Sequence, residues 1–156
     1  MPKSLPTLDN KEEAEIGAAA FHVAERPLAL SAAGDFEEIA ELYPPDATAE
    51  LHFAPLVLRG REAIYEHFHR FASAPLMIEL MWGEIVPTGL PSFLIVRSRY
   101  RLRGSATGQE AECENLHLID VDDRKITRSV DYHEHRVFRE VCAPMAPTGT
   151  DQALFR

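Results

Sequence analysis

The chain has 156 residues and carries 25 acidic against 16 basic side chains, which gives a formal net charge of −9 near neutral pH. This length fits one domain with one core, and the acidic balance argues against nucleic-acid binding, which needs a basic face. No apolar run approaches the ~20 residues of a membrane span, and two cysteines are too few for a disulfide framework. We therefore expect a cytoplasmic protein with no membrane or nucleic-acid partner.

The first half of the chain has helical periodicity. Residues 11–31 are rich in Ala and Glu, and Pro27 must either kink this helix or begin a new turn. Asp35 is a suitable N-cap for a second helix, with Glu38 as its capping-box partner. Gly60 precedes a third amphipathic segment. The predicted elements, in chain order, are helix 11–31, a helix from Asp35 to Tyr43, strand 48–53 and helix 61–72.

From Pro75 onwards the apolar residues alternate with period two, which predicts long strands. The turn at 122–124 is so short that the strands on either side of it must form an antiparallel hairpin. Helices followed by a run of such strands indicate an α+β domain with its helices on one face of a sheet. The predicted strands are 76–86, 92–103, 110–121 and 125–138, and the domain is 11–140, between tails at 1–10 and 141–156.

Alternation also predicts which side chains share a face. In strand 92–103 the arginines point one way, and four desolvated arginines without partners would be prohibitively costly. The arginine face should therefore be the outer one, next to Glu112 and Glu114 of the following strand. The inner face then holds the polar residues Ser98, Tyr100, Asn115 and His117. In the last strand the same rule places Val130 and Tyr132 inside, and so does not by itself direct Asp131 into a cavity.

Other chemistry-bearing residues allow plainer interpretations. His133 and His135 have a spacing that metals use, but further ligands with sensible spacing are missing, so we expect no metal. His67 and His69 lie two apart on a helix and are expected in solvent. Trp82 either walls a pocket or packs in the core. No phosphate-binding loop or dinucleotide motif occurs, and we expect no cofactor.

Four segments, taken in order, resemble the nuclear transport factor 2-like superfamily and within it the SnoaL-like, or polyketide cyclase-like, proteins. Such proteins carry a catalytic Asp at the end of a motif similar to Gly-Arg-Ile-x-x-x-x-Asp and a His one strand earlier, which Ile126, Asp131 and His117 match. The chain differs from them at Arg128-Ser129-Val130, so the substrate class does not follow. The segments are Ala33-Gly34-Asp35-Phe36, Tyr43-Pro44-Pro45-Asp46-Ala47-Thr48-Ala49-Glu50, Gly60-Arg61-Glu62-Ala63-Ile64 and Asp123-Arg124-Lys125-Ile126-Thr127-Arg128-Ser129-Val130-Asp131.

The resemblance implies a cone: a strongly curved, antiparallel or mixed sheet wrapped around three N-terminal helices. It also implies that Asp131 points into the cone as a general base beside His117, and burial should raise the pKa of Asp131. Tyr100 and Asn115 would donate to a developing enolate. The ligand-binding residues expected around the pair are Tyr100, Asn115, Ser98, Trp82, Leu51 and Phe53.

Two related activities do not fit the residues. The general-base position of the ketosteroid isomerases falls at Leu51 and their oxyanion-hole tyrosine at Pro27, and neither residue can perform the role. The Arg-x-Asp pair of limonene epoxide hydrolases is here Arg99-Tyr100-Arg101, without a carboxylate. Three functions stay open: acid/base chemistry of cyclase, isomerase or lyase type on a small, mostly apolar carbonyl compound, binding of a small molecule without catalysis, or a homodimerising interaction domain. The resemblance to the family also implies a homodimer that forms through the outer face of the sheet.

Overall fold

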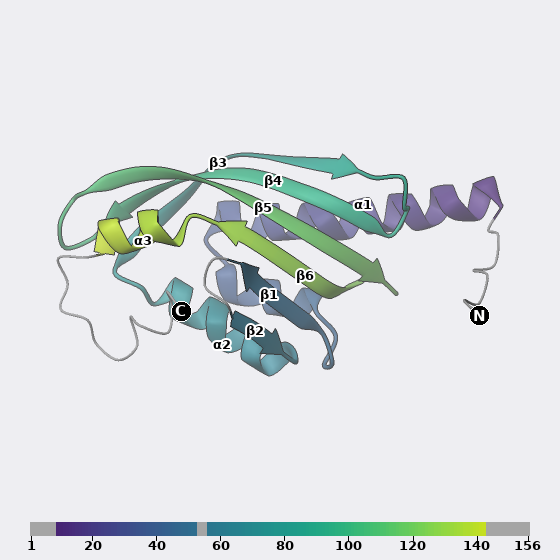
Figure 1. The fold of residues 1–156 in the computed structure, drawn as a ribbon, viewed down its shortest axis with the longest axis horizontal. Coiled ribbons are helices and arrows are strands. Elements are labelled where there is room, and N and C mark those ends of the chain that lie inside the picture. Colours follow the sequence, from purple (N-terminus) through teal and green to yellow (C-terminus); the bar gives the residue numbers. More distant parts are fainter. Residues whose placement is uncertain (1–8, 53–55, 143–156) are drawn as a thin grey trace.

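The computed structural model describes residues 9–52 and 56–142 (Figure 1). Most of the predicted tails 1–10 and 141–156, and Phe53, therefore lie outside the described residues, whereas residues 9–10 begin the first helix and residues 141–142 end the last one. The chain forms an α+β fold in which helices come first and long strands follow, as the sequence predicts. The elements are α1 (Asn10–Ala33), the 3₁₀ helix η1 (Phe36–Leu42), β1 (Thr48–His52), β2 (Leu56–Arg59), α2 (Arg61–Ala72), β3 (Leu76–Pro87), β4 (Phe93–Gly104), β5 (Glu110–Asp122), β6 (Lys125–His133) and α3 (His135–Cys142).

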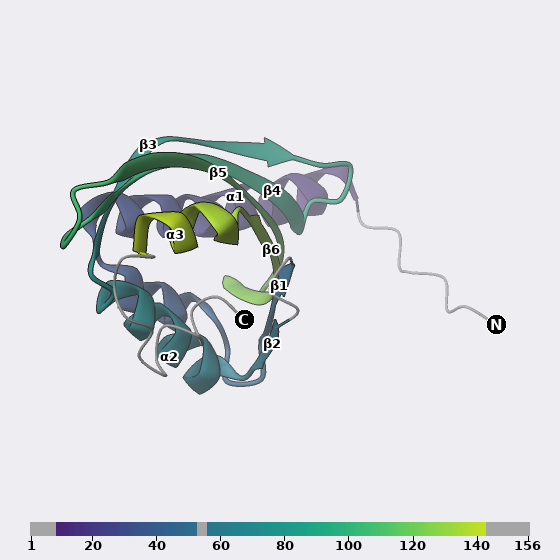
Figure 2. The ribbon, with the colours of Figure 1, turned by 60° about the vertical axis from the view of Figure 1, so that its left-hand side comes forward.

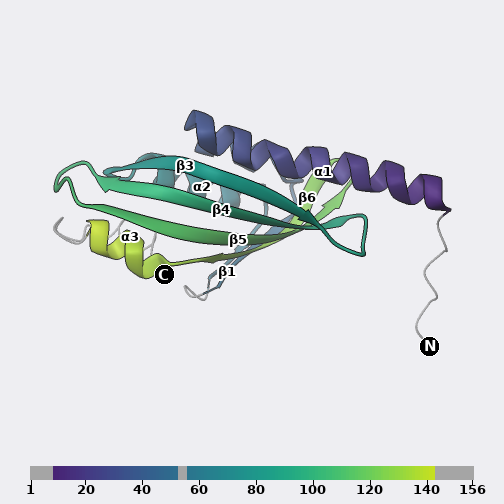
Figure 3. The same ribbon diagram turned by 90° about the horizontal axis from the view of Figure 1, so that it is seen from above.

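The first helix is set by its two ends. The Asp9 carboxylate accepts from the backbone N–H of Glu12, whose side chain reaches back to the Asp9 N–H, so a capping box begins the helix. The helix continues through Pro27 and ends at Gly34, whose φ of 81° is a left-handed conformation that glycine adopts without strain. In Figure 3 the N-terminal part of α1 extends beyond the sheet.

The second predicted helix differs from expectation. It is a 3₁₀ helix, and Asp35 precedes it without a side-chain cap, because the backbone carbonyl of Asp35 accepts from the Glu38 N–H instead. This i→i+3 pattern is the tighter geometry of short connecting helices. It carries Phe36, Ile39 and Tyr43 to the concave side of the sheet, where they border a cavity.

The six strands form one mixed sheet in the order β2-β1-β6-β5-β4-β3. β5 and β6 pair antiparallel, which confirms the predicted hairpin, while β1 and β6 pair parallel. Figure 2 shows the sheet curving round α2 and α1, so that both helices lie on its concave side. The predicted cone-like fold is confirmed.

Two elements correct the sequence prediction. β2 was not expected, and it pairs with β1 at one edge of the sheet. The strand predicted over 125–138 ends at His133, and α3 follows it. In α3 the buried residues Val137, Phe138 and Val141 recur at helical spacing and pack with Tyr100, Leu102 and Cys113 in a cluster against β4 and β5. No helix in the described ranges is long and apolar enough to cross a membrane.

Candidate functional site

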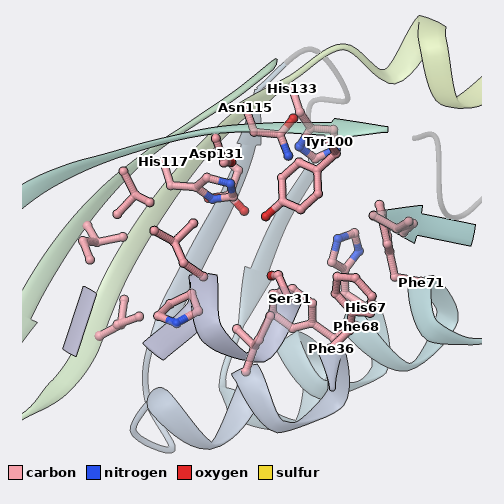
Figure 4. A pocket seen from close by; sticks show the side chains of 18 of the residues that line it. Ser31, Phe36, His67, Phe68, Phe71, Tyr100, Asn115, His117, Asp131 and His133 are labelled. Atoms are coloured by element: carbon pink, nitrogen blue, oxygen red, sulfur yellow. The ribbon is translucent and has the colours of Figure 1, made fainter. Parts of the chain in front are cut away.

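A cavity lies between the inner face of the sheet and the helices, with about 820 Å³ of empty space when its open mouth is included. Most of its wall is apolar, contributed by residues such as Leu28, Phe68 and Ile119. Its polar lining comes from both helices and sheet (Figure 4), because α1, α2 and strands β4 to β6 each contribute. These polar residues are Ser31, Tyr43, His67, Ser98, Tyr100, Asn115, His117, Asp131 and His133.

Strand register explains why the polar residues meet. His117 of β5 pairs with Asp131 of β6, and two residues further along the same face Asn115 pairs with His133. Ser98 of β4 lies directly opposite Asn115. Directly paired side chains on one face have Cβ atoms about 5 Å apart, so the register alone places an imidazole and a carboxylate in contact.

His117 and Asp131 form the central interaction of the cavity. His117 Nδ1 lies 2.7 Å from Asp131 Oδ1. An ionised carboxylate can only accept, so Nδ1 carries the proton in this hydrogen bond and Nε2 is the nitrogen left for other partners. Asp131 is 7% exposed and the side chain of His117 is 29% exposed, so this is a charge-assisted pair of a buried carboxylate and a partly buried imidazole.

The pair has shifted pKa values in opposite directions. Burial by itself would raise the pKa of Asp131, but the His117 charge and hydrogen bond, with further contributions from His133 and His67, outweigh it and lower that pKa below 3.8. Burial would lower the pKa of His117, yet Asp131 raises it above 6.5. The predicted increase in the pKa of Asp131 is therefore wrong, because the prediction counted burial without the histidine charges.

Two histidines in the cavity were not expected there. His67 of α2 is 6% exposed and His133 at the end of β6 is 7% exposed, and both border the cavity. The expectation of a solvated His67 is wrong, although its neighbour His69 does lie near the surface, against Glu37. A signal for His67 existed in the sequence: it lies three residues after Ile64, a buried residue on the face of α2 that packs inward.

Two tyrosines complete the polar lining. The Tyr43 O–H donates to the Ser129 hydroxyl over 3.1 Å, and burial raises the pKa of Tyr43 with a further contribution from Asp131. Burial also raises the pKa of Tyr100, and the Ser31 and Ser98 hydroxyls offset part of this increase. Both phenols therefore keep their protons near neutral pH and can donate hydrogen bonds.

The structure brings Asp131, His117, Asn115, Tyr100 and Ser98 to one cavity, and leaves other predicted residues outside it. Leu51 is buried beside Asp131 in the sheet but does not border the cavity. Trp82 lies on the outer face, 37% exposed, with the Arg97 guanidinium 5.8 Å from its ring centre. The cause is an irregularity of register between Leu80 and Trp82: Leu80 pairs with the inner Tyr100, whereas Trp82 pairs with the outer Arg99.

The last strand also reverses its predicted faces. Asp131 points inward with Ser129, as the family resemblance implied, and Tyr132 stacks on His52 with ring centres 4.6 Å apart. Alternation had placed Val130 and Tyr132 inside. Hydrophobic pattern fails on this strand because its inner face contributes polar residues to a cavity and does not pack in a close-packed core.

Comparison with known proteins agrees with this geometry. The family model of the SnoaL-like domain matches residues 24–129. The chain belongs to the SnoaL-like domain family. The predicted SnoaL-like family is therefore confirmed, and the chain shares the fold of a solved nuclear transport factor 2-like protein. No protein of curated function matches the sequence.

Solved structures share the fold of this SnoaL-like protein at low identity. A phenazine biosynthesis-related protein from Pseudomonas aeruginosa has 18% identity and a TM-score of 0.71, over 90% of this chain and 95% of that one. A protein from Xanthomonas campestris, assigned to the polyketide cyclases, has 16% identity and a TM-score of 0.68, over 82% and 97%. An NTF2-like protein from Burkholderia xenovorans has 18% identity and a TM-score of 0.58, over 87% and 99%. At these identities the likeness establishes the fold and no particular activity.

Proposed function

We propose that this SnoaL-like protein performs cofactor-independent acid/base chemistry, of cyclase, isomerase or dehydratase type, on a small, mostly apolar carbonyl compound. The observation that carries the proposal is the 2.7 Å contact between His117 Nδ1 and Asp131 Oδ1 in an otherwise largely apolar cavity. Buried, paired titratable groups in a cleft are frequent at sites of proton transfer.

The shifted pKa values assign the roles within the pair. Asp131, with its pKa lowered, stays ionised and accepts a proton poorly. His117, with its pKa raised, is the group that exchanges protons near neutral pH. In the proposed reaction neutral His117 removes a proton from the carbon next to the carbonyl through Nε2, and Asp131 orients the ring and stabilises the imidazolium. His117 then returns the proton to another atom of the substrate.

The other polar residues supply the second requirement of such chemistry, a donor for the enolate oxygen. The Tyr100 phenol keeps its proton because burial raises its pKa. Asn115 lies beside His133 in the sheet and borders the same cavity, so its amide N–H is a further donor. The apolar wall around them, including Phe36 and Ile39, favours an apolar substrate and strengthens electrostatic interactions by excluding water.

Hydrogen–deuterium exchange tests the proposal without knowledge of the substrate. The full chain is incubated in deuterium oxide with neutral ketones such as acetophenone and β-tetralone, and loss of the α-proton signal is followed by NMR. We expect His117→Gln to slow the enzyme-dependent exchange by about 10²–10⁴-fold and Asp131→Asn by at least about tenfold. Asp120→Asn removes a carboxylate from the outer face of β5, where it pairs with Arg128, and serves as the matched control. Exchange that is unchanged in His117→Gln contradicts the proposal.

A second candidate is a small-molecule-binding module without catalysis. The lowered pKa of Asp131 favours this candidate, because a general base acting alone would need the opposite shift. Ketones that bind the cavity, seen as chemical-shift changes of the lining residues, but undergo no protein-dependent exchange would establish the binding module in place of the enzyme.

A further inference from the structure

Two polar atoms in the wall of the cavity have no hydrogen-bond partner among the described residues. They are Oγ of Ser98 on β4 and Oδ1 of Asn115 on β5, and the fold encloses both atoms. Ser98 as a whole is 1% exposed. A buried polar atom without a partner is rare and costs free energy, so each one in a folded protein needs an explanation. The proposed proton transfer gives neither oxygen a role.

Strand register places these two side chains next to each other on the inner face. Ser98 and Asn115 are directly paired residues of β4 and β5, and side chains paired in this way have Cβ atoms about 5 Å apart. Both border the cavity, and Figure 4 shows Asn115 in its wall beside Tyr100. Rotation about χ1 of Ser98 and χ2 of Asn115 turns both oxygens toward the cavity without moving the backbone. One group of a bound ligand can therefore contact both.

The chemistry of the two oxygens favours a neutral donor on the ligand. Asn115 Oδ1 can only accept hydrogen bonds, whereas the Ser98 hydroxyl can donate one and accept others. Tyr100 lies two residues further along β4, and its pKa responds to the Ser98 hydroxyl. A Ser98 proton turned toward that phenol leaves Oγ as a second acceptor. Neither oxygen carries a charge that would compensate a buried cation, and two acceptors disfavour an anion.

We propose that Ser98 and Asn115 form a subsite that binds a hydroxyl group of the ligand. His117 follows Asn115 by two residues on the same face of β5, which separates the subsite from the imidazole by about 7 Å along the strand. Combined with the proposed function, on which this part rests, the substrate is a hydroxylated ketone. The carbon next to its carbonyl faces His117, and Ser98 and Asn115 hold a hydroxyl several bonds away.

Matched probes test the subsite separately from catalysis. Acetophenone and para-hydroxyacetophenone differ by one hydroxyl at the end of the ring away from the ketone, and para-methoxyacetophenone keeps that oxygen without its proton. Affinities for the full chain are measured by NMR titration or calorimetry at about pH 6, where the phenol is neutral. We expect para-hydroxyacetophenone to bind at least about tenfold more tightly than either other probe, because unpaired buried acceptors discriminate against a ligand that cannot donate.

Two variants show whether this preference belongs to the subsite. The double variant Ser98→Ala/Asn115→Leu should lose the preference for para-hydroxyacetophenone. Ser105→Ala is the matched control, because it removes an exposed hydroxyl from the turn after β4, and it should keep the full preference. Equal affinity of the three probes for the unaltered protein, no saturable binding of para-hydroxyacetophenone at millimolar concentration, or a preference that survives the double variant each overturn the subsite. Tighter binding of para-aminoacetophenone overturns the choice of a hydroxyl.

Stability without ligand tests whether the Ser98 oxygen is unpartnered. Ser98→Ala removes a buried hydroxyl that has no hydrogen bond, so the free energy of unfolding should change little or rise. Tyr43→Phe removes a buried hydroxyl that does have a partner, and serves as the comparison. A loss in Ser98→Ala as large as the loss in Tyr43→Phe would show that Ser98 is already bonded within the fold, and overturns its place in the subsite.

The two proposals fail in distinguishable ways. A preference for the hydroxyl probe that depends on Ser98 and Asn115, without exchange of ketone protons, supports the subsite and refutes the enzyme. Exchange that depends on His117, without preference for the hydroxyl probe, supports the enzyme and refutes the subsite. Circular dichroism and melting of each variant confirm that the compared proteins are folded.

Discussion

The two faces of β4 and β5 both carry polar side chains, but these side chains find their partners in different surroundings. On the outer face Arg97, Arg99, Arg101 and Arg103 alternate with glutamates of β3 and β5, and most of these groups are half in solvent. On the inner face His117 of β5 and Asp131 of the neighbouring strand β6 form one short contact in a cavity. The outer face has many weak pairs, whereas the inner face has one strongly coupled pair.

The difference between the faces is a difference in solvation. An exposed ion pair exchanges water for a partner and contributes about 0–1 kcal/mol, so losing one contact in the arginine row has little consequence. On the inner face the Asp131 carboxylate is buried and loses most of its hydration, so it depends on the charge of His117. The predictions below test this contrast, beginning with the largest expected change.

Removing one partner of the inner pair should have the largest effect on stability. His117→Leu fills the space of the ring but leaves the Asp131 carboxylate buried without its nearest charge. We expect the free energy of unfolding to fall by about 3 kcal/mol, measured by urea denaturation near pH 6. A loss no greater than that of an outer-face variant would mean that Asp131 is solvated or is neutral in the fold.

The contribution of the inner pair should depend on pH in a defined window. Asp131 has its pKa lowered from 3.8, so its contribution is complete above pH 3.8 and disappears as pH falls through the lowered value. His117 has its pKa raised from 6.5, so its contribution is complete below pH 6.5 and disappears as pH rises through the raised value. Asp131→Asn should therefore lower the melting temperature most between pH 3.8 and pH 6.5, where both contributions are complete. A difference that is constant from pH 3 to 9 would contradict the pairing.

The same variant should change the proton affinity of His117. Without the carboxylate only burial remains, and burial lowers the pKa of an imidazole. We expect the pKa of His117 to move from above 6.5 in the unaltered protein to below 6.5 in Asp131→Asn, followed by NMR titration of the ring signals. An unchanged pKa would assign the shift to another group.

A neutral buried contact should lie between the two faces in its effect. Tyr43→Phe removes the hydrogen bond from the Tyr43 hydroxyl to the Ser129 hydroxyl and keeps the ring in place. We expect a loss of about 1 kcal/mol in the free energy of unfolding. Chemical denaturation measures it, with Tyr65→Phe, at an exposed position of α2, as the matched control. Equal losses in the two variants would show that the Ser129 contact contributes nothing.

The outer face should show the smallest effect in the monomer. Glu112→Gln breaks contacts with Arg99 and Arg101, and we expect the free energy of unfolding to fall by less than about 1 kcal/mol, and by still less at high salt.

We also propose that this face carries the homodimer contact predicted from the family. Sedimentation at micromolar concentration tests this: a dimer weakened by Glu112→Gln supports it, and a monomer in the unaltered protein refutes it.

The sequence by itself determined the α+β class, the hairpin of β5 and β6, and the faces of β4 and β5. Alternating residues on a regular strand must point to opposite sides, and four arginines cannot be desolvated without partners. This local rule was sufficient to place Ser98, Tyr100, Asn115 and His117 on one inner face. The inward direction of Asp131 came from the family motif, since alternation on β6 indicated the reverse.

Tertiary structure alone decided the rest, because those features depend on contacts between distant segments. The register irregularity next to Leu80 moves Trp82 to the outer face, and the alternation of residues in this strand does not predict that irregularity. His67 and His133 become buried only because α2 and the end of β6 close the same cavity. The pKa of Asp131 depends on three histidines from different elements, so burial counted from its own strand predicted the wrong sign. On the regular strands β4 and β5 periodicity thus fixes the direction of a side chain, while the charge state of that side chain depends on what the fold places around it.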